Sequence, residues 1–121
     1  MEVRETRYDG SVVLSPSGRI DLTNAEAFKE LLLQAVGTAQ SALILDLSKV
    51  DYLSSAGLRS VMIASKSGKP NGVILGIAAM QPVVKEIFAI SRFDLVFPCF
   101  ETTRGAIAEL APHALGAFGT A

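Results

Sequence analysis

The sequence predicts one α/β domain in which a β-hairpin is followed by alternating strands and helices. The hairpin is indicated by Asp9-Gly10, which separates β-prone runs at residues 3–8 and 12–15 and suits a type I′ turn. Buried strands are indicated by the continuous apolar runs at residues 42–45 and 73–77. We therefore expect a mixed sheet of four to five strands, packed with about four helices and joined by right-handed later crossovers.

The first helix has a recognisable start. Thr23 and Glu26 have the spacing of a capping box, and Gly37 fits a C-terminal cap. Before this helix, the Pro-Ser-Gly sequence at residues 16–18 is expected to end the second strand. One face of the helix, at i, i+3, i+4, i+7 spacing, is expected to be buried, and it consists of Phe28, Leu31, Leu32 and Ala35.

The middle of the chain continues the alternation of strand and helix. The strand at residues 42–45 is expected to lead into a loop at residues 46–51 and then a helix at about 57–67. After the strand at 73–77, Pro82 suits the first turn of a third helix.

The last part of the chain completes the domain. A short strand is expected near residues 95–97 and a last helix at about 103–110. We place the domain at residues 1–111. Because it is rich in Ala and Gly, the tail at residues 112–121 is expected to be loosely ordered.

Composition narrows the class of protein. The chain has 121 residues, 50% hydrophobic and 19% charged, which suffices for one core and argues against disorder. The 11 basic and 12 acidic residues give a formal net charge of −1 and are mixed along the chain, so nucleic-acid binding is not expected. Cys99 is the only cysteine, which excludes an intrachain disulfide and suits a reducing compartment.

Neither a targeting segment nor a membrane-spanning segment is expected. The first residues carry no basic region followed by an apolar run, as a signal peptide would. The longest apolar stretch, at residues 72–80, is about half the length needed to cross a bilayer. We therefore predict a cytoplasmic protein that does not act at a membrane.

The side chains that enzymes commonly use are missing from suitable places. The one histidine, His113, falls in the tail, and no pair of His or Cys residues has metal-ligand spacing. No glycine-rich phosphate loop is present. Asp46 ends a buried strand, as the phosphorylated aspartate of a receiver domain does, but the acidic pair and lysine of a receiver are missing. We predict no enzyme, no catalytic residue, no metal site and no cofactor, and interpret Asp46 as helping the 46–51 loop to turn.

The most informative segment is residues 51–59, Asp-Tyr-Leu-Ser-Ser-Ala-Gly-Leu-Arg, which joins a buried strand to a helix. Functional loops of α/β folds gather at this end of the sheet. Ser54 and Ser55 stand where the helix begins, and serine there is most often an N-cap, which contributes about 1 kcal/mol. Capping is compatible with function, because the free N–H groups at a helix start also tolerate a phosphate.

With residues 43–59, the segment Gly-Arg-Ile-Asp-Leu-Thr-Asn-Ala at 18–25 resembles the STAS domain of bacterial anti-sigma factor antagonists. The stretches at residues 81–88 and 93–98 resemble the later helix and final strand of that family. The resemblance extends from about residue 3 to 110, and the Ser-Ser-Ala-Gly-Leu-Arg element at 54–59 is its most specific part. It implies the STAS fold.

The resemblance also implies partner switching in the regulation of bacterial transcription. In this family the unmodified antagonist binds an anti-sigma factor that is also a serine-protein kinase of the histidine-kinase-like ATPase fold. The kinase phosphorylates a serine before the second helix, which releases the complex, and a serine phosphatase resets the switch. By position relative to the Gly-Leu pair, the phosphoacceptor corresponds to Ser55.

The chain departs from many family members at two positions. They have aspartate where this chain has Ser54, and often Ser or Thr where it has Ala56. Ser54 therefore remains as a second, less favoured phosphoacceptor. Asp21 matches a family position that lies near this loop, and the resemblance implies that it helps to arrange the phosphoacceptor. The expected partner-binding surface, to which exposed parts of the hairpin turn are added, consists of Asp21, Leu53, Ser54, Ser55, Ala56, Gly57, Leu58 and Arg59.

Alternative functions are a STAS scaffold subunit of a signalling or transport complex, and a small nucleotide-binding protein. Phosphate incorporation that depends on Ser55 distinguishes the switch from the scaffold, and tight nucleotide binding would favour the last alternative. Association of two copies through the apolar tail, including Leu115 and Phe118, is also left open.

Overall fold

A β-hairpin opens the structure, as the sequence predicts. The computed structural model describes residues 1–119, and in it β1 (Glu2–Tyr8) pairs antiparallel with β2 (Ser11–Ile20). Asp9 and Gly10 form the turn with φ angles of 48° and 87°. Two successive positive φ angles are the geometry of a type I′ turn, which explains why the Asp-Gly dipeptide is found there.

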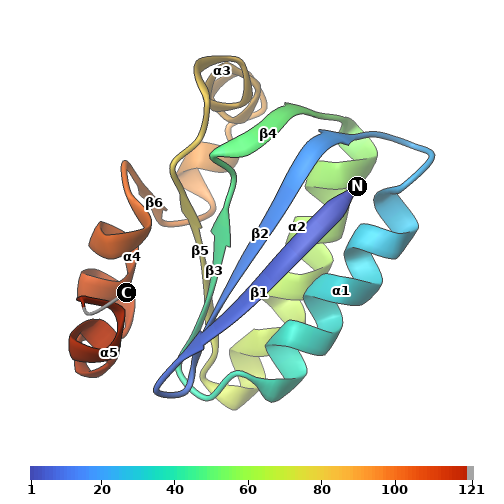
Figure 1. Cartoon of the computed structure of the whole chain (residues 1–121). Coiled ribbons are helices and arrows are strands. Elements are labelled where there is room, and N and C mark those ends of the chain that lie inside the picture. Colours follow the sequence, from blue (N-terminus) through green and yellow to red (C-terminus); the bar gives the residue numbers. More distant parts are fainter. Residues whose placement is uncertain (120–121) are drawn as a thin grey trace.

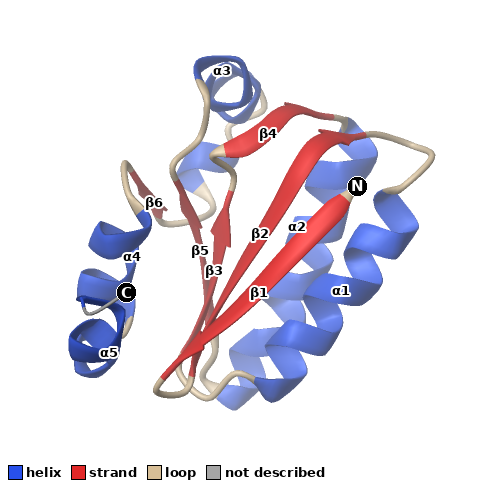
Figure 2. Cartoon of the chain, viewed as in Figure 1, coloured by secondary structure: helices blue, strands red, loops and turns tan. Residues whose placement is uncertain are grey.

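The remaining strands run parallel to β2 or to one another. The main path through the sheet is β1-β2-β3-β5-β6, and β4 pairs with β2 beside β3. Figures 1 and 2 show helices α1 and α2 on one face of the sheet, α4 and α5 on the other, and α3 next to β4. After the hairpin the elements are α1 (Ala25–Thr38), β3 (Ala42–Asp46), β4 (Lys49–Leu53), α2 (Ser55–Gly68), β5 (Ile74–Ala78), α3 (Pro82–Ile90), β6 (Cys99–Phe100), α4 (Thr103–Leu110) and α5 (Leu115–Gly119).

Strand β2 changes its parallel partner along its length. It pairs with β3 from Ser11 to Leu14, and with β4 from Ser17 to Ile20. Pro16 lies between the two registers, where the N–H that proline lacks is not needed by either parallel ladder. The predicted break at residues 16–18 is therefore wrong, because β2 continues through it to Ile20.

The predicted α/β class is confirmed, and residues 1–119 contain six strands rather than four to five, with five α-helices. The additional strand is β4, which lies in the segment expected to be a loop at residues 46–51. In β4 only Val50 and Leu53 are buried. The sequence of β4, Lys-Val-Asp-Tyr-Leu, does not have the continuous apolar character of β3.

Two apolar layers enclose the sheet. The larger lies beneath α1, α2 and α3 and includes Leu14, Phe28, Leu45 and Phe88, all of which are 1% exposed or less. The smaller lies beneath α4 and α5 and consists of Ile44 together with Val13, Ile107 and several alanines. Since side chains of a strand alternate between faces, β3 supplies both layers, as its continuous apolar run predicts.

The position of the last strand differs from the prediction. The short strand lies at Cys99–Phe100 rather than near residues 95–97, where Leu95 and Val96 are 75% and 52% exposed. Residues 112–119, which belong to the tail that the sequence predicts to be loosely ordered, form a 3₁₀ turn and α5, with Ala114 buried and the Phe118 ring 5.1 Å from the ring of Tyr8. Residues 120–121 of that tail lie outside the described part of the chain.

Candidate functional site at the start of helix α2

The carboxyl ends of β2 and β4 bring two loops together. These parallel strands pair Ile20 with Leu53, and the backbone N–H of Ser54 donates to the Ile20 carbonyl at 2.9 Å. Asp21 follows the first strand and Ser54 the second. Two of the segments that carry the family resemblance, residues 18–25 and 43–59, therefore lie side by side at this end of the sheet.

Ser54 is the N-cap of α2. Its Oγ accepts a hydrogen bond from the Gly57 N–H at 3.2 Å, and its carbonyl accepts one from the Leu58 N–H at 2.9 Å. Ser54 is half-buried, and its backbone N–H is also used, as described above. The capping interpretation that the sequence allows for these serines thus applies to Ser54.

Ser55 is the first residue of α2 and is exposed. Among residues 1–119 its hydroxyl has no hydrogen-bond partner. The adjacent backbone N–H groups of the first helical turn and the helix dipole favour negative charge at this position. The two neighbouring serines therefore differ: one closes the helix end and the other presents a free hydroxyl to solvent.

Asp21 is held by the residues that follow it. Its Oδ1 accepts hydrogen bonds from Thr23 Oγ1 at 2.6 Å and from the Thr23 N–H at 3.0 Å. These bonds, with the charge of Arg19 as a smaller contribution, lower the pKa of Asp21 below its ordinary value. The carboxylate also lies 3.6 Å from Arg19 Nε, so it stays ionised beside the start of α2.

The predicted capping box of α1 is wrong. Thr23 uses its hydroxyl as a donor to Asp21 rather than as an acceptor from the helix, and Glu26 pairs with Lys29 at 2.9 Å. The N-cap is Asn24, which makes no side-chain capping bond. Its side chain instead bridges the preceding loop, since Oδ1 accepts from the Asp21 N–H and Nδ2 donates to the Arg19 carbonyl.

Three residues of the expected partner surface lie in the interior. Leu53 and Leu58 are 1% and 6% exposed, and Gly57 is buried. A Cβ on Gly57 would lie 2.5 Å from Leu53 Cδ1 and 3.0 Å from Ile20 Cγ2. These residues fix the position of the α2 start against the sheet, and they are not accessible to a partner in this conformation.

Two of the remaining residues of the expected surface, Ala56 and Arg59, line a groove between α1 and α2. The groove has a volume of about 330 Å³, and Ala56 and Arg59 are on its α2 side. On its rim, Leu22 is 83% exposed and Ile63 39%. Neither side chain was among the residues expected from the sequence. Two features of the sequence could have indicated their exposure: Leu22 stands between polar residues, and Ile63 does not lie on the buried face of α2.

The hairpin turn does not belong to this surface. Asp9 and Gly10 precede the amino end of β2, whereas the α2 start follows the carboxyl ends of β2 and β4. Figure 1 shows the turn at the opposite end of the sheet from the start of α2. The hairpin turn expected from the sequence is therefore removed from the site.

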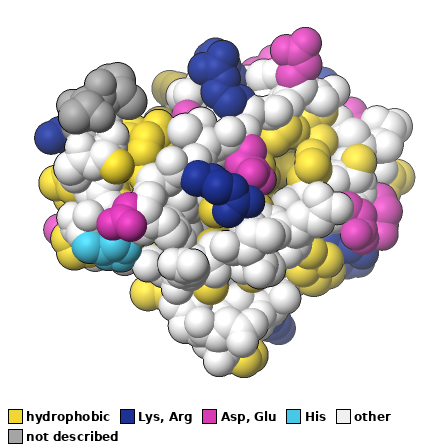
Figure 3. Space-filling model, turned by 60° about the horizontal axis from the view of Figure 1, so that its bottom comes forward, with side chains coloured by type: hydrophobic (Ala, Val, Ile, Leu, Met, Phe, Trp, Pro, Cys, Tyr) yellow, Lys and Arg dark blue, Asp and Glu magenta, His cyan; other side chains and the backbone are white. Residues whose placement is uncertain are grey.

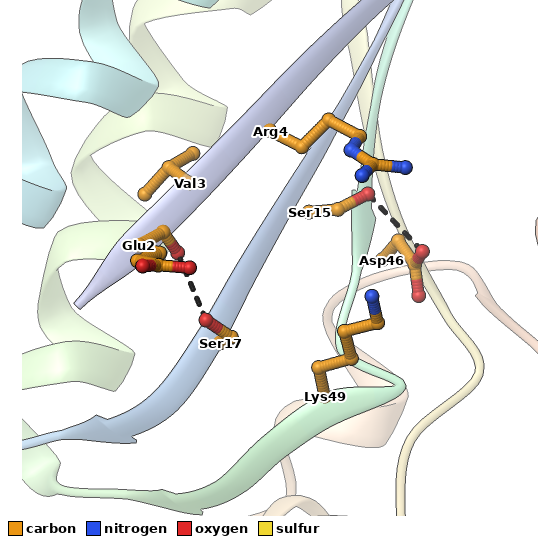
Figure 4. Close-up of a pocket in the computed structure, with 7 residues that line it drawn as sticks. All are labelled: Glu2, Val3, Arg4, Ser15, Ser17, Asp46 and Lys49. Carbon is orange, nitrogen blue, oxygen red and sulfur yellow. Dashed lines mark hydrogen bonds between the residues drawn. The ribbon is translucent and has the colours of Figure 1, made fainter.

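A larger hollow lies on the face of the sheet opposite α1 and α2, where β2 and β3 separate (Figure 4). Its volume is about 640 Å³, and Arg4, Lys49, Glu2 and Asp46 give it charges of both signs. Asp46 accepts hydrogen bonds from Ser15 Oγ at 3.1 Å and from the Ser48 N–H at 3.0 Å. The second bond supports the turn that leads into β4, consistent with the structural role expected for Asp46.

The surface and the described helices carry few other indications of chemistry. Figure 3 shows basic and acidic side chains interspersed on the face that it presents. Within residues 1–119, no group of three or more His, Cys, Asp and Glu side chains could hold a metal ion. None of the helices described has the length and apolar character to span a bilayer.

Comparison with known proteins identifies the family. The model of the STAS domain family matches residues 2–106, so the chain belongs to this family. RsfB of Mycobacterium tuberculosis, named an anti-sigma-F factor antagonist, is 32% identical over 100 residues, which cover 83% of this chain and 81% of RsfB. The resemblance deduced from the sequence is confirmed.

Solved structures agree with this family and fold. The crystal structure of an anti-sigma factor antagonist from Mycobacterium paratuberculosis is 29% identical, with a TM-score of 0.81, and the match covers 90% of this chain and 92% of that one. SpoIIAA, a Bacillus cell fate determinant solved in its phosphorylated form, has a TM-score of 0.67 at 16% identity, covering 88% and 96% of the two chains. The likeness to SpoIIAA shows the fold alone.

Proposed function

We propose that this protein is an anti-sigma factor antagonist whose binding to its partner is controlled by phosphorylation of Ser55. Unmodified, it binds in the bacterial cytoplasm to an anti-sigma factor that is also a serine kinase of the histidine-kinase-like ATPase fold. Phosphorylation releases the complex, and a serine phosphatase restores binding. The names of the relatives support antagonism, and SpoIIAA is a relative of the same fold that exists in a phosphorylated form.

One observation carries the choice of residue. Ser55 is exposed with an unpartnered hydroxyl, among the described residues, at the positive end of α2. Ser54, the alternative acceptor, is half-buried and its Oγ is engaged with the Gly57 N–H. A kinase that modifies Ser54 would have to break the cap, which contributes about 1 kcal/mol.

The groove beside Ser55 supplies the rest of the proposed interface. Exposed Leu22, in the loop before α1, and Ile63, on α2, provide apolar contact. Arg59, also on α2, provides a cation. Asp21 contributes by fixing the loop that carries Leu22, and the buried residues Leu53, Gly57 and Leu58 contribute by holding the α2 start in place. Ala56 offers no hydroxyl and forms part of the contact surface.

A phosphate at Ser55 would weaken binding more than it weakens the fold. It adds roughly −1.5 to −2 charges to a surface that a partner must desolvate. Residues 55 and 59 are i and i+4 on α2, so the phosphate is also placed to pair with Arg59 and withdraw this cation from the partner. Moving an affinity from nanomolar to micromolar takes about 4 kcal/mol. The helix dipole returns at most roughly 2 kcal/mol, and it does so equally in free and bound protein.

Phosphorylation is tested by incubating the purified chain with ATP and lysate of its native bacterium. Trypsin cleaves after Lys49 and Arg59, so one peptide of residues 50–59 carries both serines, and fragmentation distinguishes them. We expect phosphate on Ser55, loss of incorporation in Ser55→Ala, and retention in Ser54→Ala. Phosphate on Ser54 alone would overturn the assignment, and incorporation on neither serine would favour the scaffold alternative.

Partner control is tested by affinity capture with three baits: wild type, Ser55→Ala and Ser55→Asp. We expect the first two to retain an ATPase of the histidine-kinase-like fold and the third to lose it. If all three baits retain the same proteins, Ser55 does not control binding. Thermal unfolding of each bait checks that the aspartate variant is folded.

A further inference from the structure

Strand β1 has an open outer edge. All of its residues from Glu2 to Tyr8 are paired with β2 on one side, and within residues 1–119 no strand pairs with it on the other. Figure 1 shows β1 as the edge of the sheet nearest the viewer, with no helix in front of it. An unpaired edge presents free N–H and C=O groups to a further strand. This edge can therefore accept one more strand.

The side chains of β1 alternate in charge rather than repeating one sign. Arg4, Glu5 and Arg7 are exposed, and Glu5 already lies 3.1 Å from Arg7 on the same face. Charges usually protect an edge strand, because pairing in most registers brings like charges together. A mixed pattern leaves open the registers in which opposite charges meet.

Two-fold symmetry limits the registers available to two copies of the chain. An antiparallel pair in one continuous sheet has its axis perpendicular to that sheet, so one residue must face its own copy. Registers centred on Arg4, Glu5 or Arg7 place like charges directly opposite each other. The register centred on Val3 uses little more than the first residues of β1, and the one centred on Tyr8 uses mainly the turn.

The register centred on Thr6 satisfies both charge and length. It aligns Arg4 to Tyr8 of both copies, and Glu5 of each copy stands opposite Arg7 of the other. Threonine facing threonine is a favourable cross-strand pair, and Arg4 faces the aromatic ring of Tyr8. We propose that β1 pairs with β1 of a second copy in this register, so that the sheets of the two copies become continuous.

The proposed pairing leaves the phosphorylation site open. Thr6 pairs with Val13, whereas Ser54 is bonded to Ile20, seven residues further along β2. At the rise of a strand this separation is about 23 Å. Pairing of two edge strands buries less surface than a standard interface, so the dimer is expected to be weak and dependent on concentration.

Charge reversal tests the register. The test is sedimentation equilibrium of the full chain, up to the highest soluble concentration at low ionic strength. We expect reversible dimers whose dissociation constant rises as salt is added. Glu5→Arg and Arg7→Glu each place like charges opposite each other, and each should raise the dissociation constant by at least about tenfold. The double reversal restores the opposite pairs and should return the dimer. A monomer at every concentration, or dimers indifferent to these changes, would overturn the proposal.

Cysteine cross-linking supplies an independent test in a Cys99→Ser background. In the Thr6-centred register, Thr6→Cys faces itself at a separation of about 5 Å, within reach of a disulfide. The matched control Arg4→Cys is offset from its copy by about 13 Å and should not cross-link. Oxidation of Thr6→Cys to a covalent dimer supports the register, and preferential cross-linking of Arg4→Cys would contradict it.

Discussion

Helices α1 and α2 begin side by side at the ends of β2 and β4, but their first turns are stabilised in different ways. At α2 a serine side chain caps the helix directly, through the bond from the Gly57 N–H to Ser54 Oγ. At α1 the Asp21 carbonyl accepts from the Ala25 N–H at 2.9 Å, while the Asp21 carboxylate holds Thr23. The α2 start is therefore fixed by packing and a cap, and the hydroxyl of the next residue, Ser55, has no partner among residues 1–119.

The α2 start should be the less tolerant of added volume. Gly57→Ala places a Cβ 2.5 Å from Leu53 Cδ1 in the core, and we expect it to lower the free energy of unfolding by about 1–3 kcal/mol. Urea denaturation followed by circular dichroism measures the change.

The matched control is Gly37→Ala near the end of α1. A Cβ there meets no neighbouring atom of the described residues within 4 Å, and the φ of Gly37 is not positive, so the substitution should be neutral or stabilise by up to about 1 kcal/mol. Equal effects of the two substitutions would show that the α2 start is not packed as described.

Removing the cap should have a smaller effect than adding volume. Ser54→Ala leaves the Gly57 N–H without its acceptor and should lower stability by about 1 kcal/mol. Ser55→Ala removes a hydroxyl that is unpartnered within the described chain, and it should change stability by less than about 0.5 kcal/mol. Thermal unfolding of the two variants separates the structural serine from the one assigned to regulation, and a larger loss for Ser55→Ala would reverse these roles.

The same contrast explains how far the sequence predicted the structure. The hairpin, β3, β5, α3 and α4 follow from local patterns, such as Asp9-Gly10 at the turn, continuous apolar runs, and Pro82 at the start of α3. The segment containing Ser54 and Ser55 was found from its place between strand and helix, together with the family resemblance. Which serine caps the helix depends on the backbone conformation of Ser54, an extended residue with ψ of 171°, which spacing alone does not determine.

The failures arise where a contact between distant segments overrides a local pattern. Thr23 and Glu26 have capping-box spacing, but Asp21 and Lys29 offer their side chains better partners. Strand β4 forms because β2 extends beyond β3 and leaves an edge to pair, which no property of residues 49–53 alone indicates. The burial of Gly57 likewise depends on Leu53 and Ile20, which belong to the sheet beneath it.

The smallest predicted effect concerns the titration of Asp21 at the α1 start. Its pKa is lowered chiefly by the Thr23 hydroxyl, so Thr23→Val should raise that pKa toward its ordinary value, while Thr23→Ser should leave it low. A carboxyl group with a lowered pKa contributes stability above its ordinary pKa, and this contribution is lost as pH falls through the folded value. Carboxyl-carbon NMR titration of Asp21 between neutral and strongly acidic pH measures both variants. An unchanged pKa in Thr23→Val would mean that the backbone N–H of residue 23 and Arg19 are sufficient to hold the carboxylate ionised.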